Sequence, residues 1–422
     1  MTFAISGDCC SDASCVAVCP MNSIHPSPGE PGFGTGASLF IDPRTCIDCG
    51  ACADVCPVDA AKPADESAPG DVQRNAAYFA EREPLQAMDL DSWEPPSYQV
   101  WGGGPRRVLV VGAGPAGMYA TRELLLRTSA EITVVDRSEQ LGGLVRFGVA
   151  PDHPQTKQII ETFERLVRHP RVRWRPATDA AELRSGPDGL PDGYDAVVHA
   201  VGARRSRRLR ITGEDAACTA EDFVAWYNGR PGAPAPADLV GPRAVVVGNG
   251  NVALDLARLL LSDEEQLRGM DILPEVRRVL AGSGIKEVVL LGRRGPDQAA
   301  YTEPALRELL AVAGDRVELR YHARPVAWTA GGLVLDSGET IAAGNLFTAI
   351  GFEGRPIDGL PFDAARGIVP NDRGAVVGRP GHYVAGWIKR GARGGIGVNK
   401  ACAQETVMTL VSSSRAAASP GS

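Results

Sequence analysis

The sequence predicts a small cysteine-rich α+β domain followed by two α/β domains of the Rossmann-like, three-layer type. Eight of the ten cysteines lie within the first 56 residues. Farther along, the β-branched runs at 107–111 and 244–247 each lead into a glycine-rich turn and then into a helical stretch. Two such units in one chain indicate two parallel sheets, each with a nucleotide site at its edge. The length of 422 residues suits about three domains.

Composition along the chain gives the expected domain boundaries. Residues 1–62 form the cysteine-rich domain, and the Pro-, Ala- and Gly-rich residues 63–104 form a linker with one helix near 72–82. The first nucleotide-binding domain comprises 105–203 and 345–411, and the second, 204–344, is inserted between them. The small polar residues 412–422 are expected to form a disordered tail.

Composition and charge exclude several classes of protein. The chain is 44% hydrophobic and 23% charged, without an apolar run long enough to span a bilayer, so we expect no membrane segment. The start, Met1-Thr2-Phe3, lacks the pattern of a secretory signal, which predicts a cytoplasmic protein. Residues 1–66 hold nine acidic and two basic side chains and thus carry the whole net charge of -7. Nucleic-acid binding therefore has no electrostatic support.

The second group of cysteines has the spacing of a bacterial iron-sulfur motif. Cys46, Cys49, Cys52 and Cys56 follow the pattern C-x2-C-x2-C-x3-C-P. In this pattern three thiolates bind one cluster and the fourth, before proline, binds the other cluster. Zinc is the alternative, but zinc sites use paired CxxC units that are well separated in sequence.

The first group has the same spacing with one exception. Cys9, Cys15 and Cys19 occupy thiolate positions, and Asp12 stands where the second thiolate is expected. Crossed ligation then assigns one 4Fe-4S cluster and one cluster with three thiolates. The ligands of the 4Fe-4S cluster are Cys19, Cys46, Cys49 and Cys52. The ligands of the other cluster are Cys9, Cys15 and Cys56. The second cluster is either 3Fe-4S, or 4Fe-4S with Asp12 or water on the labile iron, and Cys10 is an alternative to Cys9. Residues 1–60 resemble the seven-iron type of bacterial ferredoxin.

The first glycine-rich turn has the pattern of a dinucleotide site. Gly112, Gly114 and Gly117 form G-x-G-x-x-G between a strand and a helix, and Asp136 closes the next strand. Such glycines let the backbone approach a pyrophosphate at the helix N-terminus, and the acid can bind ribose hydroxyls. A ribose-binding acid disfavours a 2'-phosphate, so FAD or NADH suits this site better than NADPH.

The second glycine-rich turn favours NADPH. Its pattern is Gly248-x-Gly250-x-x-Ala253, and the strand at 287–291 ends in Gly292-Arg293-Arg294 instead of an acid. Two guanidinium groups can bind a phosphate through charge-assisted hydrogen bonds. The alternative interpretation is that the two arginines belong to a solvated turn.

Longer motifs resemble those of adrenodoxin reductase-type ferredoxin-NADP reductases over about 105–410. The motifs that carry the resemblance are Leu144–Pro154, Trp226–Asn228, Gly248–Asp255, Gly292–Pro296 and Gly386–Gly391. The fusion to a ferredoxin resembles the actinobacterial branch of that family. The resemblance implies a glutathione reductase-like arrangement of FAD-binding and NADP-binding domains.

The resemblance also implies roles for individual residues. Those matched to FAD contacts are Ala116, Asp136, Leu144, Trp387, Gly394, Gly395 and Ile396, of which Trp387 and Gly394 also match the nicotinamide side. Those matched to NADP contacts are Asn249, Gly250, Asn251 and Val252 for the pyrophosphate, with Arg293 and Arg294 for the 2'-phosphate. His153 and Glu308 match a pair near flavin and nicotinamide, although a packing role for His153 is equally compatible with the sequence.

The chain departs from the family pattern at three places. A glutamate expected beside the nicotinamide ribose falls at Ala305, so that either Glu303 or no residue replaces it. Ala392 and Arg393 replace a Pro-Thr pair after Gly391. Between Glu308 and Thr348 the chain is shorter than its relatives.

Together these features predict an NADPH-ferredoxin oxidoreductase. Such an FAD enzyme accepts a hydride and passes single electrons to its own iron-sulfur clusters and on to an acceptor protein, or operates in reverse. The expected acceptor is a haem protein or another ferredoxin. One alternative is the electron-input subunit of a larger reductase, such as the small subunit of glutamate synthase. Another is a non-catalytic redox sensor. The arginine-rich run at 204–210 is either a docking surface for the acidic domain or a solvated hinge.

Overall fold

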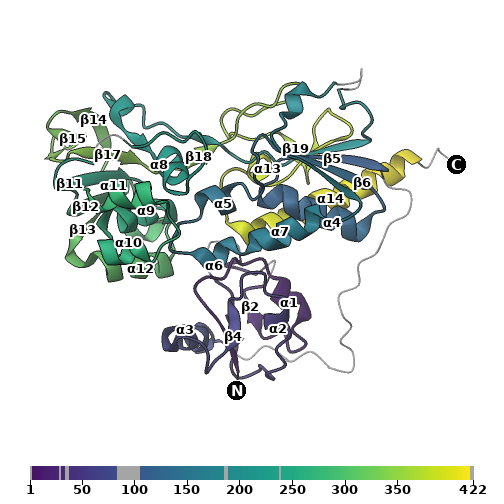
Figure 1. The fold of residues 1–422 in the computed structure, drawn as a ribbon, viewed down its shortest axis with the longest axis horizontal. Coiled ribbons are helices and arrows are strands. Elements are labelled where there is room, and N and C mark those ends of the chain that lie inside the picture. The colour runs from purple at the N-terminus through teal and green to yellow at the C-terminus, as the bar shows by residue number, and fades with distance from the viewer. Residues whose placement is uncertain are drawn as a thin grey trace. The chain divides into compact units, whose positions relative to one another are not determined.

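The structure is a computed structural model that describes residues 2–27, 30–33, 38–82, 105–184, 189–236 and 239–418. The chain forms two compact units. Unit 1 comprises Met1–Arg146, Gln155–Ala203 and Gly354–Ser422, and unit 2 comprises Phe147–Pro154 and Arg204–Glu353. Figure 1 labels the helices and strands of both units and colours the chain by residue number.

The cysteine-rich part of unit 1 contains two short antiparallel ribbons and three helices. These elements are β1 (Phe3–Ile5) paired with β4 (Ala61–Pro63), β2 (Ile24–His25) paired with β3 (Phe40–Ile41), α1 (Ser14–Val18), α2 (Ala51–Asp54) and α3 (Pro69–Phe79). The buried Asn75 amide holds α3 in place, because its oxygen accepts the N–H groups of Ile5 and Ile41 at 3.1 and 2.7 Å and its nitrogen donates to the carbonyl of Ile5. A buried amide needs such partners. The domain therefore extends through α3, into the segment for which the sequence predicted a linker.

The nucleotide-binding part of unit 1 has a seven-stranded sheet in the order β19-β20-β21-β8-β5-β6-β7. Its parallel strands are β5 (Arg107–Val111), β6 (Glu131–Val135), β7 (Val172–Arg175), β8 (Ala196–His199) and β21 (His382–Val384), and β19 (Asn371–Asp372) and β20 (Ala375–Val376) form an antiparallel edge. The associated helices are α4 (Pro115–Arg127), α7 (Ile159–Val167), α13 (Trp387–Arg390) and α14 (Ile396–Ala418), with a 3-10 turn at Ala180–Glu182. Helices α4 and α14 pack side by side (Figure 1). Short helices α5 (Leu144–Gly148) and α6 (Pro154–Lys157) lie where the chain passes between the units.

Unit 2 has a five-stranded parallel sheet in the order β10-β17-β11-β12-β13. Its strands are β10 (Cys218–Thr219), β11 (Arg243–Val247), β12 (Glu287–Leu291), β13 (Val317–Arg320) and β17 (Asn345–Thr348), and its helices are α8 (Ala220–Tyr227), α9 (Asn251–Leu261), α10 (Glu264–Arg268), α11 (Pro274–Ala281) and α12 (Glu303–Ala313). A three-stranded antiparallel sheet, β14 (Pro325–Thr329), β15 (Gly332–Leu335) and β16 (Thr340–Ile341), and a ribbon of β9 (Arg205–Ser206) with β18 (Phe352–Glu353) complete it. Turns of 3-10 helix lie at Glu214–Ala216, Pro296–Gln298 and Gly314–Arg316. The core around α8 and α9 is mainly aliphatic and includes the fully buried aromatic side chains of Phe223, Tyr227 and Phe347.

Three boundaries differ from those expected from composition. Strand β17 pairs with β11, so the chain leaves unit 2 after residue 353 and not at 344. Residues 147–154 belong to unit 2, although they lie within the range assigned to the first nucleotide-binding domain. Helix α14 continues to Ala418, into the expected tail. Among the described residues, no helix combines the length and the apolar character needed to cross a membrane.

A buried histidine pair in unit 1 predicts acid sensitivity. His199 ends β8 and His382 begins β21, their rings stack, and Nε2 of His199 lies 3.1 Å from Nδ1 of His382. Burial, with the neighbouring His382, lowers the pKa of His199 to about 3. In the unfolded chain a histidine has a pKa near 6.5, so between these values the unfolded state binds the extra proton and stability falls as the pH falls.

We expect the folded protein to lose about 2 kcal/mol from this group between pH 7 and pH 5. His199→Gln removes the titrating group, so its thermal transition, followed by circular dichroism, should depend less on pH than that of the wild type. His169→Gln changes an exposed histidine and is the control. Equal pH dependence of all three proteins would contradict the assignment.

Candidate functional site

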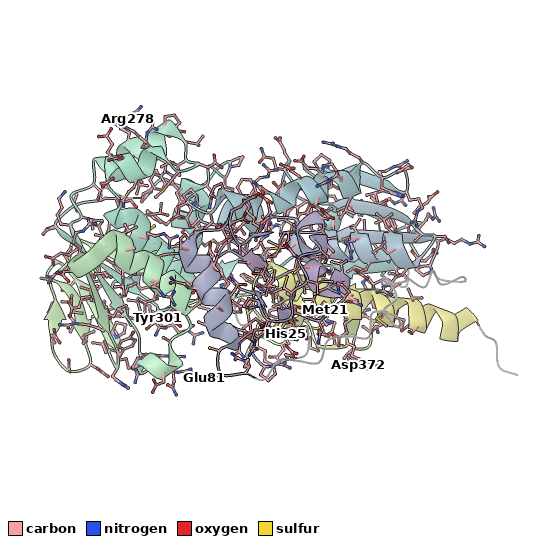
Figure 2. The ribbon with its side chains drawn as sticks, turned by 90° about the horizontal axis from the view of Figure 1, so that it is seen from below. Met21, His25, Glu81, Arg278, Tyr301 and Asp372 are labelled. Carbon is pink, nitrogen blue, oxygen red and sulfur yellow. The ribbon has the colours of Figure 1, made fainter. Side chains whose placement is uncertain are left out.

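One cavity in the cysteine-rich domain is lined by four cysteines. It is lined by Cys19, Cys46, Cys49 and Cys52 together with apolar side chains such as Met21, which is labelled in Figure 2. These are the four cysteines that the spacing assigns to the 4Fe-4S cluster. The structure thus brings together, from two segments of the chain, the thiols that crossed ligation groups together.

The second cavity is lined by the remaining members of the two groups. It is lined by Cys9, Cys10, Asp12, Cys15 and Cys56. Both Cys9 and Cys10 reach it, so that neither is separated from the site by the fold. The amide of Ser11 donates to Sγ of Cys9 at 3.3 Å, and the amide of Ala60 donates to Sγ of Cys56 at 3.1 Å. Amide hydrogen bonds to sulfur are one means by which proteins tune cluster potentials.

The loops that carry the two cysteine groups share one backbone pattern. In the first loop Ser11 and Ala13 are left-handed, with φ of 52° and 57°, and Ala13 is the N-cap of α1. In the second loop Asp48 and Gly50 are left-handed, with φ of 60° and 74°, and Gly50 is the N-cap of α2. The left-handed residues stand two and four positions after Cys9 and after Cys46. This register matches Cys9, and not Cys10, to Cys46, and it places Asp12 where Cys49 stands in the second loop.

Without a bound cation, the thiols of these cavities do not readily lose their protons. Burial raises the pKa of Cys9 to about 11 and that of Cys52 to about 12. Both groups are therefore protonated at neutral pH in the protein alone. Because metal ligands must be deprotonated, binding of iron would release these protons.

The first nucleotide turn lies between β5 and α4. A Cβ on Gly112, which has φ of 107°, would lie 2.5 Å from the carbonyl oxygen of Ala200, and a Cβ on Gly117 would lie 1.8 Å from the carbonyl oxygen of Gly112. These two glycines are required by the protein's own packing. Gly114 is different, because the nearest atom to its Cβ would be 3.9 Å away.

The turn at Gly114 leaves the N-terminus of α4 open. Gly114 is the N-cap of α4 and provides no side-chain cap, so the first N–H groups of the helix are open to a ligand. Asp136, at the end of β6, is buried and accepts the N–H groups of Ala113 and Ser138 at 2.8 Å each. Its carboxylate is thus fixed beside the turn.

The segments matched to the flavin ring lie together at the start of α14. The indole nitrogen of Trp387 donates to the carbonyl of Gly394 at 3.1 Å. Gly386, before Trp387, approaches α4 so closely that a Cβ there would lie 2.5 Å from Cβ of Ala116. Leu144, which begins α5, is exposed. Gly395 and Ile396 then lead into α14, where Asn399 donates to the carbonyl of Gly395 at 3.0 Å.

The second nucleotide turn in unit 2 has the same construction. A Cβ on Gly248 would lie 2.3 Å from the carbonyl oxygen of Ala349, whereas a Cβ on Gly250 would meet only Cβ of Ala300, at 3.9 Å. Gly250 is the uncapped N-cap of α9. The protein itself therefore leaves room at the second glycine of each turn, where the backbone approaches a pyrophosphate in dinucleotide sites.

The other residues predicted to bind NADP surround this turn. The side-chain oxygen of Asn251 accepts the N–H of Thr302 at 2.8 Å, and Asn249 packs against Gly292. Val252 follows in the first turn of α9. Arg293 and Arg294 are exposed at the end of β12, and no ion pair within the described residues engages their guanidinium groups. His322, a residue that the motifs did not indicate, donates its backbone N–H to the carbonyl of Arg294.

A charge cluster in unit 2 holds His153. Arg258 on α9 is buried and binds Asp152 at 2.5 Å and Asp255 at 2.9 Å. It also lies 3.2 Å from Nε2 of His153 and 3.8 Å from Glu308. His153 and Glu308, matched only by resemblance, are 3.7 Å apart.

Burial and the charge of Arg258 shift the pKa values of the carboxyl groups in this charge cluster. Although burial opposes it, the hydrogen bond from Arg258 holds the pKa of Asp152 below its usual range. Burial raises the pKa of Glu308, against the pull of His153 and Arg258. The sequence did not indicate Arg258. An arginine three positions after Asp255 on an otherwise apolar helix was the available signal.

Comparison with known proteins gives the family. Residues 106–404 match the family model for pyridine nucleotide-disulphide oxidoreductase, and residues 8–60 match that for a 4Fe-4S dicluster domain. The chain is 38% identical to the probable ferredoxin/ferredoxin--NADP reductase of Mycobacterium tuberculosis over 97% of this chain and 84% of that protein. The chain belongs to this ferredoxin-NADP reductase family.

Further relatives cover the reductase part. The chain is 37% identical to NADPH-ferredoxin reductase FprA of Mycobacterium tuberculosis over 73% of this chain and 84% of that protein. The solved structure of FprA in complex with NADPH has a TM-score of 0.67 and 34% identity, covering 75% of this chain and 87% of FprA. The fold class predicted from the sequence, a ferredoxin domain joined to a two-domain flavin and NADP reductase, is thereby confirmed.

Within this ferredoxin-NADP reductase, Glu303 does not belong to the charged residues around His153. Glu303, which we considered in place of a family glutamate, is exposed and pairs with Arg307 at 2.6 Å. Ala305, at the glutamate position, packs against the core of unit 2. The charged groups around His153 are instead Asp152, Arg258 and Glu308, at 3.9, 3.2 and 3.7 Å from its Nε2.

The arginine-rich run of the reductase is engaged by acids of its own unit. Arg205 lies 3.4 Å from Glu353, and Arg208 lies 3.4 Å from Glu214 and 2.5 Å from Asp215. These contacts favour the interpretation of 204–210 as a hinge.

Proposed function

We propose that this chain is an NADPH-ferredoxin oxidoreductase that transfers electrons from NADPH to the clusters of its own ferredoxin domain and on to an acceptor protein, or in the reverse direction. The observation that carries the proposal is the presence, in one chain, of two cysteine-lined cavities and two dinucleotide turns. The relative that is 38% identical over 97% of the chain bears both names, ferredoxin and ferredoxin--NADP reductase, which favours this function over a glutamate synthase-type subunit or a sensor.

We propose that the first cavity binds a 4Fe-4S cluster through Cys19, Cys46, Cys49 and Cys52. The second cavity would bind its cluster through Cys9, Cys15 and Cys56. Asp12 accepts hydrogen bonds from the N–H and hydroxyl groups of Ser14 at 3.1 and 2.5 Å, which supports a 3Fe-4S cluster over a 4Fe-4S cluster with Asp12 as ligand.

FAD is assigned to the Gly112–Gly117 turn, with Ala116, Asp136 and Leu144 beside it and the ring against Trp387 and Gly394–Ile396. When bound, FAD supplies the conversion between a two-electron hydride and single electrons. The chain's part is to hold the pyrophosphate at the α4 N-terminus, to fix Asp136 by two amide hydrogen bonds, and to hold Trp387 against Gly394.

NADP(H) is assigned to the turn at Gly248–Val252, with its 2'-phosphate on Arg293 and Arg294. His153 and Glu308 are assigned to the nicotinamide end. Arg258 orients His153 through its 3.2 Å contact with Nε2 and is a positioning residue. The acceptor is proposed to be a haem protein or another ferredoxin. A cytoplasmic location agrees with this function because cysteines stay reduced, and able to bind iron, in a reducing compartment.

Anaerobic titration of the purified protein with NADPH tests the proposal. One FAD and two clusters per chain are expected, with bleaching of the flavin absorption and reduction of cytochrome c as artificial acceptor. A protein that binds no flavin, or that holds zinc instead of iron and sulfide, would refute it.

The two open glycine positions predict a separation of binding from folding. Gly114→Ala and Gly250→Ala add a methyl group into space that the protein leaves free, so the thermal transition should be unchanged. The methyl group would displace the pyrophosphate from the amides, and losing a hydrogen bond to a charged group costs about 1.5–3 kcal/mol. We expect about 10-fold or greater loss of FAD retention for Gly114→Ala and a similar rise in the KM for NADPH for Gly250→Ala.

Two further variants complete that comparison. Gly117→Ala should lower stability outright, because its Cβ would overlap the carbonyl of Gly112. Gly269→Ala, whose Cβ would meet its nearest neighbour at 3.5 Å, should change neither property. Unaltered cofactor binding in both Gly114→Ala and Gly250→Ala would count against the dinucleotide assignment.

A further inference from the structure

We propose that the loop from Cys10 to Ser14 docks the ferredoxin domain on the first turns of α14, and that this contact makes the Cys9-side cavity the point where electrons enter from the flavin segment. The Cys46-side cavity then serves as the outlet to the acceptor. This proposal rests on the proposed function and adds the order in which electrons pass through the two cavities.

The first contact is a close backbone approach at Gly397. The N–H of Gly397 donates to the carbonyl of Cys10 at 3.0 Å. A Cβ on Gly397 would lie 1.5 Å from the carbonyl oxygen of Ser11 and 2.8 Å from the nitrogen of Asp12. Only glycine allows the loop to lie this close to the helix. Thr156, in the same unit, adds a hydrogen bond from its hydroxyl to the carbonyl of Asp8 at 3.2 Å.

The second contact is an ion pair one turn farther along α14. Nζ of Lys400 donates to the hydroxyl of Ser14 at 2.8 Å and lies 3.6 Å from a carboxylate oxygen of Asp12. The side chains of Lys400 and Asp12 are only 17% and 9% exposed. Such a pair is screened little by salt and, unlike a surface pair, is costly to break, because removing one partner leaves the other charge buried.

The position of these contacts along the chain gives the order of the cavities. The docked loop lies between Cys9 and Cys15, which line the second cavity. On the other side of the contact, Gly397 directly follows Gly394–Ile396, the segment assigned to the flavin ring. Cys49, which lines the first cavity, is exposed, so that cavity reaches the surface where an acceptor can approach.

Electron balance follows from the established stoichiometry of hydride transfer. One hydride from NADPH supplies two electrons and one proton, leaving NADP+. The electrons leave one at a time, first through the Cys9-side cavity and then through the Cys46-side cavity, and each reduces the acceptor by one electron. The proton is released to water.

Two variants test the docking surface in the full-length holoprotein. Gly397→Ala places a methyl group on the Ser11 carbonyl and Lys400→Gln removes the cation beside Asp12. In both we expect flavin bleaching by NADPH to continue while electron transfer to the clusters, followed by stopped-flow absorbance, falls about 10-fold or more. Lys400→Arg should recover most of the rate. Gly70→Ala, where a Cβ meets nothing within 4 Å, and the exposed Lys286→Gln are controls.

A redox titration followed by EPR gives a second readout. Removing the cation of Lys400 should shift the midpoint potential of one cluster, the one in the Cys9-side cavity, to a more negative value and leave the other unchanged. If Gly397→Ala loses its flavin, Lys400→Gln decides the result. Unchanged potentials and unchanged internal rates in Lys400→Gln, in a preparation whose wild type reduces its clusters with NADPH, would overturn the docking proposal without affecting the proposed function. A wild type whose clusters stay oxidised would instead refute the function.

Discussion

Replacing Arg258 with methionine is expected to destabilise unit 2 by about 3–5 kcal/mol, the cost of removing one partner from a buried ion pair. Asp152 and Asp255, which bind the guanidinium at 2.5 and 2.9 Å, would keep their charges without compensation or would have to take up protons. For a unit of this size the thermal transition should fall by roughly 6–20 °C.

The same variant should also weaken catalysis. Asp152 anchors residues 147–154 to α9 through Arg258, and His153 lies in that segment. We therefore expect slower flavin bleaching by NADPH even at temperatures where the variant stays folded. Arg268→Met removes an exposed pair with Glu264 and should cost under about 1 kcal/mol. A small, equal change in both variants would show that the buried cluster has no structural role.

Removing either arginine after β12 should cost about 1.5–3 kcal/mol of NADPH binding, the contribution of a hydrogen bond to a charged group. This corresponds to roughly a 10- to 150-fold rise in the KM for NADPH. NADH lacks the 2'-phosphate, so its kinetics should barely change in Arg293→Ala or Arg294→Ala. Steady-state kinetics with both nucleotides separate these cases.

The control for the clamp is another exposed arginine of unit 2. Arg278, labelled in Figure 2, is exposed on α11, and Arg278→Ala should leave the preference for NADPH intact. Equal losses for NADPH and NADH in Arg293→Ala and Arg294→Ala would contradict the assignment. The alternative of a solvated turn predicts no loss for either nucleotide.

The parts of the site that local sequence specifies could be predicted. The spacing of the cysteines within each loop determines which thiols can bind the same cluster. The two cavities are lined by the sets of cysteines that this spacing predicts. The strand–glycine–helix units were found at 107–127 and 243–261 because each is a continuous segment whose glycines answer a local backbone need. Glycine spacing alone did not distinguish Gly112 and Gly117, which the protein's packing requires, from Gly114, which it does not.

Contacts between distant segments could not be predicted. Asn75 binds Ile5 and Ile41 across 70 and 34 residues, so α3 looked like part of a linker. Arg258 and Asp152 are 106 residues apart, and their pair takes 147–154 into unit 2. Such pairs carry no local pattern, because each residue alone is compatible with an exposed position. The Lys400–Asp12 contact, which spans most of the chain, is of the same kind.

The most direct test is anaerobic stopped-flow mixing of the holoprotein with NADPH at several protein concentrations. We predict that flavin bleaching is followed by cluster reduction with a rate constant independent of protein concentration, because donor and acceptor belong to one chain. Cluster reduction proportional to protein concentration, or clusters that stay oxidised while the flavin is fully reduced, would contradict the account.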